Sequence, residues 1–260
     1  MRKEADIRGL QPLVITFDAH PRTVLQADYM PRLLTTLDER RALLSQFGEV
    51  LVLPFKQVQP LTAADFMQRL SEEYQVTVLL MGYDHQFGSD RPRRPQEYRA
   101  IGAQYGIEVV QSTEFTEGEW HVSSTEIRSA LSTGNIAVAN ELLGRPYSVT
   151  GMVVHGKAIG RTIGFPTANV RPDDPHKIIP KPGVYMAQVD TPTMDAAPAF
   201  VNIDVHGEIE VHIPSFKGDL YDRQLEIQFL RFLREEKTFE DLDALREQIK
   251  ADIDSILRRA

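Results

Sequence analysis

The first half of the chain alternates short apolar runs with segments of helical periodicity. Four runs are continuously aliphatic or β-branched, as in strands buried on both faces of a sheet; they span residues 13–17, 50–55, 76–84 and 107–112. Three segments carry apolar residues at helical spacing; they span residues 37–48, 62–74 and 95–106. The second of these begins with Thr62 and Asp65 in a helix-start pattern. Strands separated by helices predict a parallel sheet in an α/β layer fold, with ligands beyond the carboxyl ends of the strands.

The second half contains strands without intervening helices. Five alternating segments are joined by Gly, Pro and Asp turns and predict an antiparallel sheet or small barrel; they span residues 147–156, 183–190, 199–205, 208–213 and 224–233. A closing helix over about residues 239–257 carries five apolar residues on one face, as plain core packing does; they are Leu242, Leu245, Ile249, Ile253 and Ile256. We place the domain boundary in "LLGRPYS", which gives domains at 1–146 and 147–260.

Composition narrows the classes of function. The 260 residues include no cysteine, which excludes a disulfide framework, a thiolate zinc site and a catalytic thiol. The net charge is −8, and the arginine-containing stretch at 89–99 is too short and mixed for a nucleic-acid stripe. No run resembles a signal peptide or a membrane span. We therefore expect a cytoplasmic protein that binds small molecules rather than nucleic acid or membrane.

The segment "HGKAIGRTIGFPTAN" at 155–169 has an unusual composition. Its last part, from residue 160 onward, fits neither an amphipathic helix nor a clean strand. The segment is not a Walker A loop, and no strand-turn-helix makes it a dinucleotide fingerprint. Its glycines, Gly156, Gly160 and Gly164, recur every four residues beside the cations Lys157 and Arg161. Such an arch lets backbone amides approach phosphate oxygens. The alternative is a pair of tight turns between barrel strands.

Thr167 and Asn169 follow this glycine arch two residues apart. In an extended chain their side chains point the same way. Two hard oxygen ligands on one side suit Mg²⁺, which keeps other positions for water and phosphate. The combination favours a phosphate-binding site over plain turns.

Several separate motifs resemble one family. "GKAIGRTIGFPTAN", "PGVY", "EVHI", "GDLYD" and "FEDLDALREQIKADI" follow the order of the riboflavin kinase domain of bifunctional riboflavin kinase/FAD synthetases. "VITFDAHP", "LLMGYDHQFG" and "VSSTEIRSALSTGNIAVANELLGRPY" resemble the FMN adenylyltransferase half. The resemblance implies a nucleotidyltransferase-like α/β domain with a Rossmann-like parallel sheet, followed by an antiparallel β-barrel with a C-terminal helix. It also implies that riboflavin is phosphorylated to FMN with Mg²⁺ and ATP and that, in the complete protein, FMN is adenylylated to FAD with release of pyrophosphate.

For the kinase half, the resemblance implies a role for each motif residue. Thr167 and Asn169 become ligands of Mg²⁺ and ATP, and Glu210 of "EVHI" becomes the catalytic base. The chemistry agrees, because a primary hydroxyl needs a carboxylate to orient it and accept its proton. The alternative for Glu210 is a solvent-facing strand residue, and His212 is interpreted as structural or peripheral. The implied phosphate clamp consists of Gly156, Lys157, Gly160, Arg161, Gly164 and Pro166.

For the adenylyltransferase half, the implied ATP and FMN contacts are more dispersed. Ser124, Thr125 and Arg128 belong to a hydroxyl-rich helix start, which suits phosphate, although the same segment could be only a capping box. His20 and Asp84 follow two predicted strands, where the family binds nucleotide and flavin. A lone histidine there is more often structural.

The sequence departs from the family pattern in two places. It contains no HxGH motif, and its first strand resembles the family's second, so we expect a first strand before the printed residues. Without that strand, the sheet has an unpaired central strand. Between "VNI" and "EVHI" the family's Arg-Pro-Thr is missing. The alternatives are a kinase with a degenerate N-terminal scaffold, or a non-catalytic flavin- or nucleotide-binding module. Retention of Thr167, Asn169 and Glu210 favours an enzyme, because binding alone requires no base beside a metal site.

Overall fold

The computed structural model describes residues 1–19, 30, 32–112, 122–156, 160, 164–214, 216–237 and 239–257, without the side chains of 242, 245 and 253–257. The chain forms two compact units. Unit 1 consists of Met1–Pro31 and Thr35–His121, and unit 2 consists of Arg32–Leu34 and Val122–Ala260. Over this described part, no helix has the length and apolar character needed to span a bilayer.

Unit 1 has the α/β pattern that the sequence predicts. Its elements, in chain order, are α1 (Arg2–Arg8), β1 (Leu13–Phe17), α3 (Leu37–Ser45), β2 (Glu49–Leu53), α4 (Phe55–Val58), α5 (Ala63–Tyr74), β3 (Val78–Met81), α6 (Pro95–Gln104) and β4 (Glu108–Gln111). The side chains of Thr62 and Asp65 form the predicted capping box at the start of α5. One core joins α5 and α6 to strands β3 and β4 through Met67, Tyr98, Met81 and Val109.

The strands of unit 1 pair in parallel, in two separate sheets. β1 pairs with β2 from Leu13 to Phe17, and β3 pairs with β4 from Val78 to Met81. Within the described ranges, neither β1 nor β3 has a second strand partner. Residues of both strands line a cavity of about 790 Å³. In the described ranges each of these strands therefore keeps one edge without a strand partner.

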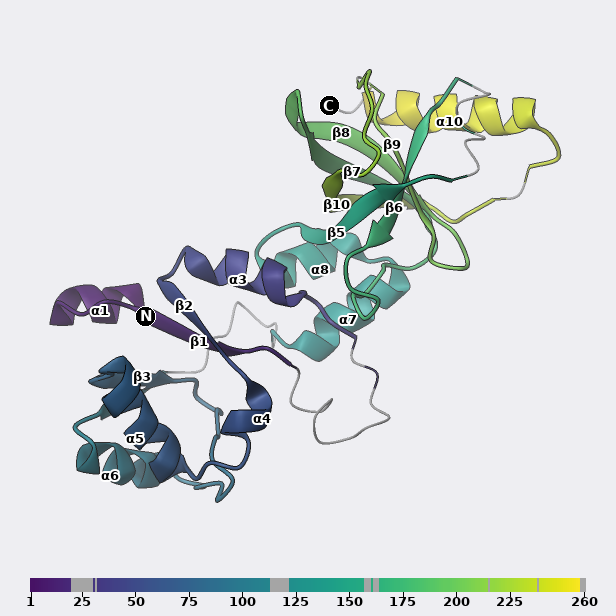
Figure 1. The fold of residues 1–260 in the computed structure, drawn as a ribbon. Coiled ribbons are helices and arrows are strands. Elements are labelled where there is room, and N and C mark those ends of the chain that lie inside the picture. The colour runs from purple at the N-terminus through teal and green to yellow at the C-terminus, as the bar shows by residue number, and fades with distance from the viewer. Residues whose placement is uncertain are drawn as a thin grey trace. The chain divides into compact units, whose positions relative to one another are not determined.

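Unit 2 is built on a closed antiparallel barrel. Its elements are α7 (Ser124–Thr133), α8 (Ile136–Leu143), β5 (Tyr147–Val154), β6 (Thr167–Pro172), β7 (Gly183–Thr191), β8 (Met194–Ile203), β9 (Ile209–His212), β10 (Gln224–Arg234) and α10 (Leu242–Leu257). The strand order is β10-β5-β6-β9-β8-β7, and the pairing of β10 with β7 closes the barrel (Figure 1). The predicted barrel is confirmed.

Helices α7 and α8 pack against the barrel and share its core. Leu131 and Ala139 from these helices are fully buried in the same cluster as Tyr147 and Phe229. Asn140 connects α8 to two strands, because its side chain donates to the carbonyl of Phe229 at 2.9 Å and accepts from the amide of Tyr147 at 2.8 Å. The compact unit thus begins before the first barrel strand.

Arg32–Leu34 joins unit 2 although the flanking residues belong to unit 1. The Leu33 amide donates to the carbonyl of His176 at 2.8 Å, and the Ile178 amide donates back to Leu33 at 3.0 Å. Lys177 is only 5% exposed; its ammonium donates to the Leu34 carbonyl at 2.8 Å and lies 4.7 Å from the centroid of the Tyr147 ring. A carbonyl and an aromatic face compensate the burial of this charge.

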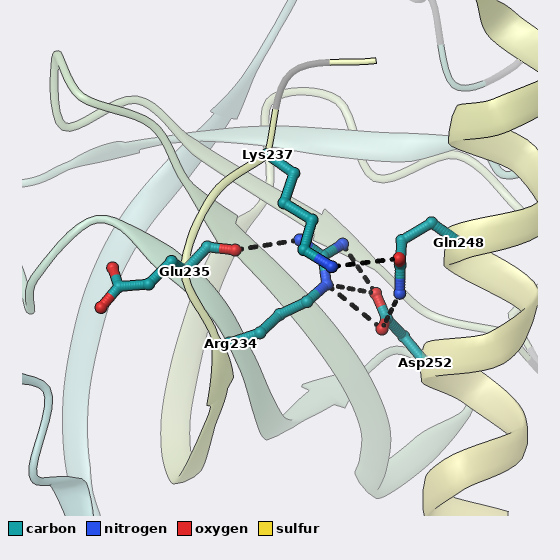
Figure 2. Close-up of polar contacts among 5 residues, drawn as sticks. All are labelled: Arg234, Glu235, Lys237, Gln248 and Asp252. Atoms are coloured by element: carbon teal, nitrogen blue, oxygen red, sulfur yellow. Dashed lines mark hydrogen bonds and ion pairs between the residues drawn. The ribbon is translucent and has the colours of Figure 1, made fainter.

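The C-terminal helix α10 is fixed to the end of β10 by a charged network, shown in Figure 2. The Arg234 guanidinium donates to Asp252 from Nε at 3.0 Å and from Nη2 at 2.8 Å. Gln248 donates to the same carboxylate at 2.9 Å, and Lys237 donates to Gln248 at 3.4 Å. The Arg234 and Asp252 side chains are 17% and 13% exposed, so this ion pair is largely removed from solvent.

Of the apolar residues predicted to share one face of α10, Ile249 is half-buried; the side chains of Leu242, Leu245, Ile253 and Ile256 lie outside the described residues. The segment after residue 160 was interpreted as neither helix nor strand, which is wrong for its last part, because β6 begins at Thr167. Proline and glycine before Thr167 concealed the alternation that follows.

The connection between β8 and β9 is a compact hairpin turn. The Asp204 carboxylate accepts hydrogen bonds from the amides of His206 and Glu208, both at 2.8 Å. The Asp204 amide donates to the Glu208 carbonyl at 3.1 Å, and Gly207 has a φ of +82° that favours glycine. The residues that replace the family's Arg-Pro-Thr segment therefore form a closed turn, which fixes the register of β9.

Candidate functional site

The kinase-type residues lie in adjacent rows on three neighbouring barrel strands. Asn169 on β6 is the register partner of Glu210 on β9, and Glu210 is the partner of Asn202 on β8. Directly opposite residues on antiparallel strands have Cβ atoms about 4.5–5.5 Å apart and share a face. The sequence thus folds into an amide, carboxylate, amide row, in which Asn202 was not predicted.

The second row lies beside the first on the same face. Thr167 pairs with His212, and His212 pairs with Phe200. The intervening residues Ala168 and Val211 are buried in the barrel core. Because strand side chains alternate, Thr167, Asn169, Glu210 and His212 all face outward from the barrel. This confirms that Thr167 and Asn169 point the same way.

Two glycines of the arch contact the predicted metal ligands closely. A Cβ at Gly156 would lie 2.1 Å from the amide nitrogen of Asn169. A Cβ at Gly160 would lie 2.3 Å from the Phe165 carbonyl oxygen and 3.2 Å from the Thr167 hydroxyl. The Phe165 amide also donates to the Gly160 carbonyl at 2.8 Å. Gly156 therefore lies against Asn169 and Gly160 against Thr167, and the absence of a Cβ permits both approaches.

Gly164 and Pro166 are the other predicted clamp residues in the described part of the chain. Gly164 has a φ of +88°, in the left-handed region that favours glycine. Pro166 is exposed and immediately precedes Thr167. Lys157 and Arg161, the predicted cations, lie outside the described residues.

A small cavity of about 80 Å³ opens beside Thr167. Phe216 and Tyr221 contribute to its wall. The Tyr221 ring stacks on His155 with centroids 3.9 Å apart, and His155 immediately precedes Gly156. A stacked pair thus supports the base of the arch. Sequence reasoning did not assign this support, because the contact joins residues far apart in the chain.

The donor set fits a hard cation better than a soft one. Thr167 offers a hydroxyl, Asn169 an amide oxygen and Glu210 a carboxylate on one face, and oxygen ligands are what Mg²⁺ prefers. In the described part of the chain no group of three His, Cys, Asp or Glu residues could hold a metal. The residues present would therefore leave coordination positions for phosphate and water.

The residues predicted for the second nucleotide site lie on separate elements. Asp84 is exposed in the loop after β3, and His20 lies outside the described residues. The Tyr98 hydroxyl fixes this loop, because it donates to the Phe87 carbonyl at 2.9 Å and accepts from the Phe87 amide at 3.0 Å. Burial raises the pKa of the Tyr98 hydroxyl, which keeps it a donor.

Helix α7 carries the other three residues. Ser124 and Thr125 are exposed in its first turn, and Ser123 caps the helix by accepting from the Glu126 amide at 3.2 Å. The Arg128 guanidinium donates to the carbonyls of Ser124 at 3.0 Å and Arg32 at 2.9 Å. In this state the predicted ligand Arg128 therefore holds Arg32–Leu34 against α7.

The barrel site and the parallel-stranded unit together define a nucleotide-dependent transferase with two domains. A riboflavin kinase family model matches residues 143–259, and an FAD synthetase family model matches residues 1–126. The bifunctional riboflavin kinase/FMN adenylyltransferase of Escherichia coli strain K12 is 34% identical over 97% of this chain and 83% of its own length. The chain belongs to the family of bifunctional riboflavin kinase/FMN adenylyltransferases.

Two further comparisons cover nearly the same length. The bifunctional enzyme of Pseudomonas fluorescens is 34% identical over 97% of this chain and 84% of its own length. A crystal structure described as a macrolide-efflux protein from Streptococcus pneumoniae is 31% identical and superimposes with a TM-score of 0.81, covering 97% of this chain and 85% of that one. The predicted family and fold class are thereby confirmed.

Proposed function

We propose that the barrel transfers the γ-phosphoryl group of ATP to the primary hydroxyl of riboflavin at the row formed by Asn169 and Glu210. The observation that carries this proposal is the direct pairing of these residues beneath the glycine arch. The hydroxyl oxygen bonds to the γ-phosphorus while the bond from that phosphorus to the bridging oxygen of ADP breaks. The products are FMN and ADP.

Glu210 is the catalytic base in this proposal. Its carboxylate orients the ribityl hydroxyl and accepts the proton that the hydroxyl loses. Asn169 is the direct register partner of Glu210, and Thr167 lies in the neighbouring row on the same face. Phosphate held by the arch therefore meets the hydroxyl beside the carboxylate. Gly156, Gly160, Gly164 and Pro166 form the described part of the clamp, and Lys157 and Arg161 supply its cations.

Thr167 and Asn169 would hold Mg²⁺ together with oxygens of ATP. When bound, the ion would offset the negative charge of the phosphates during transfer. The protein's own contribution is to place two neutral oxygen ligands and one carboxylate on one face of the barrel. The close contact of Gly156 with Asn169 orients that amide.

The N-terminal half adenylylates FMN. An oxygen of the FMN phosphate attacks the α-phosphorus of ATP, and pyrophosphate leaves, which gives FAD. Ser124, Thr125 and Arg128 bind ATP phosphates, and His20 and Asp84 contact nucleotide or flavin. The helix N-terminus at Ser123 supports this role, because its first turn presents hydroxyls and amides to an anion.

The functional domains divide as residues 1–146 and 147–260, and the kinase family match beginning at residue 143 supports that division. The enzyme is cytoplasmic in this proposal and binds small molecules; the net charge of −8 supports a protein that does not bind nucleic acid.

The test is to incubate the purified protein with riboflavin, ATP and Mg²⁺ and to separate riboflavin, FMN and FAD by chromatography. Formation of FMN and then FAD supports both activities. Formation of FMN alone supports a kinase with an inactive N-terminal domain. If neither FMN nor FAD forms, the proposal is refuted.

Two ATP analogues provide the control. α,β-Methylene-ATP cannot release pyrophosphate and so supports only the kinase step. β,γ-Methylene-ATP cannot donate its γ-phosphoryl group and so supports only adenylylation of added FMN.

A further inference from the structure

His212 is buried on a face of the barrel where its neighbours are accessible. Only 9% of the residue is exposed, whereas Glu210, two residues earlier on the same face of β9, is half-buried. Two aromatic rings cover it. Phe165 meets the imidazole edge-on with ring centroids 5.5 Å apart, and Phe200 lies beside it at 6.5 Å. The imidazole is thus held between β8 and the segment that joins the arch to β6.

A single polar contact fixes the orientation of this ring. Its Nδ1 atom lies 2.9 Å from the carbonyl oxygen of Pro166. A carbonyl oxygen can only accept, so Nδ1 must carry the proton and donate it. The tautomer follows from this partner: in the neutral ring Nε2 is unprotonated.

The Pro166 carbonyl that accepts this hydrogen bond is at the point where the arch joins β6. Pro166 directly precedes Thr167, and the neighbouring Phe165 donates its amide to the Gly160 carbonyl at 2.8 Å. The Phe165 carbonyl oxygen also lies against Gly160, because a Cβ atom added to Gly160 would be 2.3 Å from it. A rotation of the Phe165–Pro166 linkage would therefore move Gly160 away from Thr167.

We propose that His212 is a positioning residue of the kinase site, which holds Gly160 against Thr167 through its Nδ1–H bond to Pro166. The proposal rests on the proposed kinase function, because it names what orients the phosphate clamp. His212 is not the proton acceptor in this scheme, because Glu210 serves as the base and the imidazole is covered by Phe165 and Phe200.

Three substitutions separate the hydrogen bond from ring packing. In His212→Asn, the amide nitrogen takes the place of Nδ1 and can still donate to Pro166. In His212→Gln the amide is one bond further from the backbone, near the place of Nε2, and in His212→Leu no donor remains. We expect the KM for ATP to rise at least tenfold in the Gln and Leu variants and to stay within about threefold of wild type in the Asn variant.

A second measurement does not depend on activity. Amide exchange of Phe165 reports its bond to Gly160, so we expect faster hydrogen–deuterium exchange there in the Gln and Leu variants, and wild-type exchange in the Asn variant. If the wild-type protein makes no FMN but this exchange pattern holds, the kinase proposal fails and the positioning role stands.

Either of two results would overturn the inference. One is a wild-type KM and wild-type exchange in His212→Leu. The other is an Asn variant as impaired as the Leu variant in both readouts, which would assign the burial of His212 to ring packing alone. Comparing the melting temperatures of all three variants identifies any that fails to fold.

Discussion

A Cβ atom added to Gly156 would lie 2.1 Å from the side-chain nitrogen of Asn169, so these two residues are in close contact on the outward face of the barrel. No real pair of such atoms approaches that closely, and the amide of Asn169 would have to turn away. Because the displaced group is the tip of a side chain rather than backbone, the fold can accommodate the change.

We therefore expect Gly156→Ala to reduce the kcat/KM of the riboflavin kinase reaction by about tenfold or more while leaving the melting temperature nearly unchanged. Steady-state assays with varied ATP measure the first effect, and calorimetry measures the second. Gly82→Ala is the matched control, because a Cβ there meets only His85 at 3.5 Å. Equal kinase activity in both variants would contradict the assigned role of Gly156.

Glu210→Gln removes the proposed base without changing its shape. We expect kcat for FMN formation to fall by about 10²–10⁴-fold, with the Kd for ATP in the presence of Mg²⁺ nearly intact. Quenched-flow or chromatographic rates and titration calorimetry provide the two values. The control is Glu208→Gln, an exposed residue of the same hairpin. Unchanged turnover in Glu210→Gln would remove this residue from the mechanism.

Asp252→Asn tests the attachment of α10. The change leaves the largely buried Arg234 guanidinium without its ionised acceptor. We expect the free energy of unfolding of the barrel unit to fall by roughly 1.5–3 kcal/mol, measured by urea denaturation. Glu247→Gln on the same helix breaks only the exposed pair with Lys250 and should cause no measurable loss. A similar loss in both variants would mean that helix propensity, not the Arg234 contact, is being measured.

The buried Tyr185 hydroxyl makes the protein sensitive to alkali. Burial, together with the negative charge of Glu235, raises the pKa of this phenol above its ordinary value of 10.0. Above that pH the unfolded chain releases the proton while the folded chain retains it, so the free energy of unfolding falls as pH rises. The contribution is about 1.4 kcal/mol per pH unit.

Urea denaturation at several values between about pH 8 and pH 12 measures this slope. We expect Tyr185→Phe to be less stable than wild type at neutral pH, because the hydrogen bond from the hydroxyl to the Lys181 carbonyl is lost. Above pH 10 the difference should narrow. Parallel curves for the two proteins would show that this phenol does not titrate on unfolding.

The sequence predicts most of the secondary structure because the residues that pack in the core recur with the period of a helix or a strand. The run at 13–17 coincides with β1, and the Thr62–Asp65 pattern marks the start of α5. Strand β6 escaped prediction because its outward residues, Thr167 and Asn169, are small and polar and follow a glycine-rich segment. That polar face lies outside the barrel core, so core packing does not impose apolar residues on it.

Contacts in the candidate site are harder to predict than its members. Glu210 and Asn169 were named from motifs, whereas their pairing depends on the register of β6 against β9. In the sequence, Asn202 is one polar residue within an apolar run. Its position beside Glu210 follows only from the register of β8 against β9. The same holds for His155, whose stacking partner Tyr221 comes from a distant turn.

The insertion of Arg32–Leu34 into unit 2 has a consequence for dissecting the enzyme. A gene truncated to begin at Val122 would encode the barrel but not the carbonyl of Leu34 that accepts from the buried Lys177. Such a fragment would lack a piece of its own surface, and a short synthetic peptide containing Arg32–Leu34 would be its natural complement. The folded barrel unit is thus not one continuous stretch of sequence, because it includes three residues that lie within the sequence of unit 1.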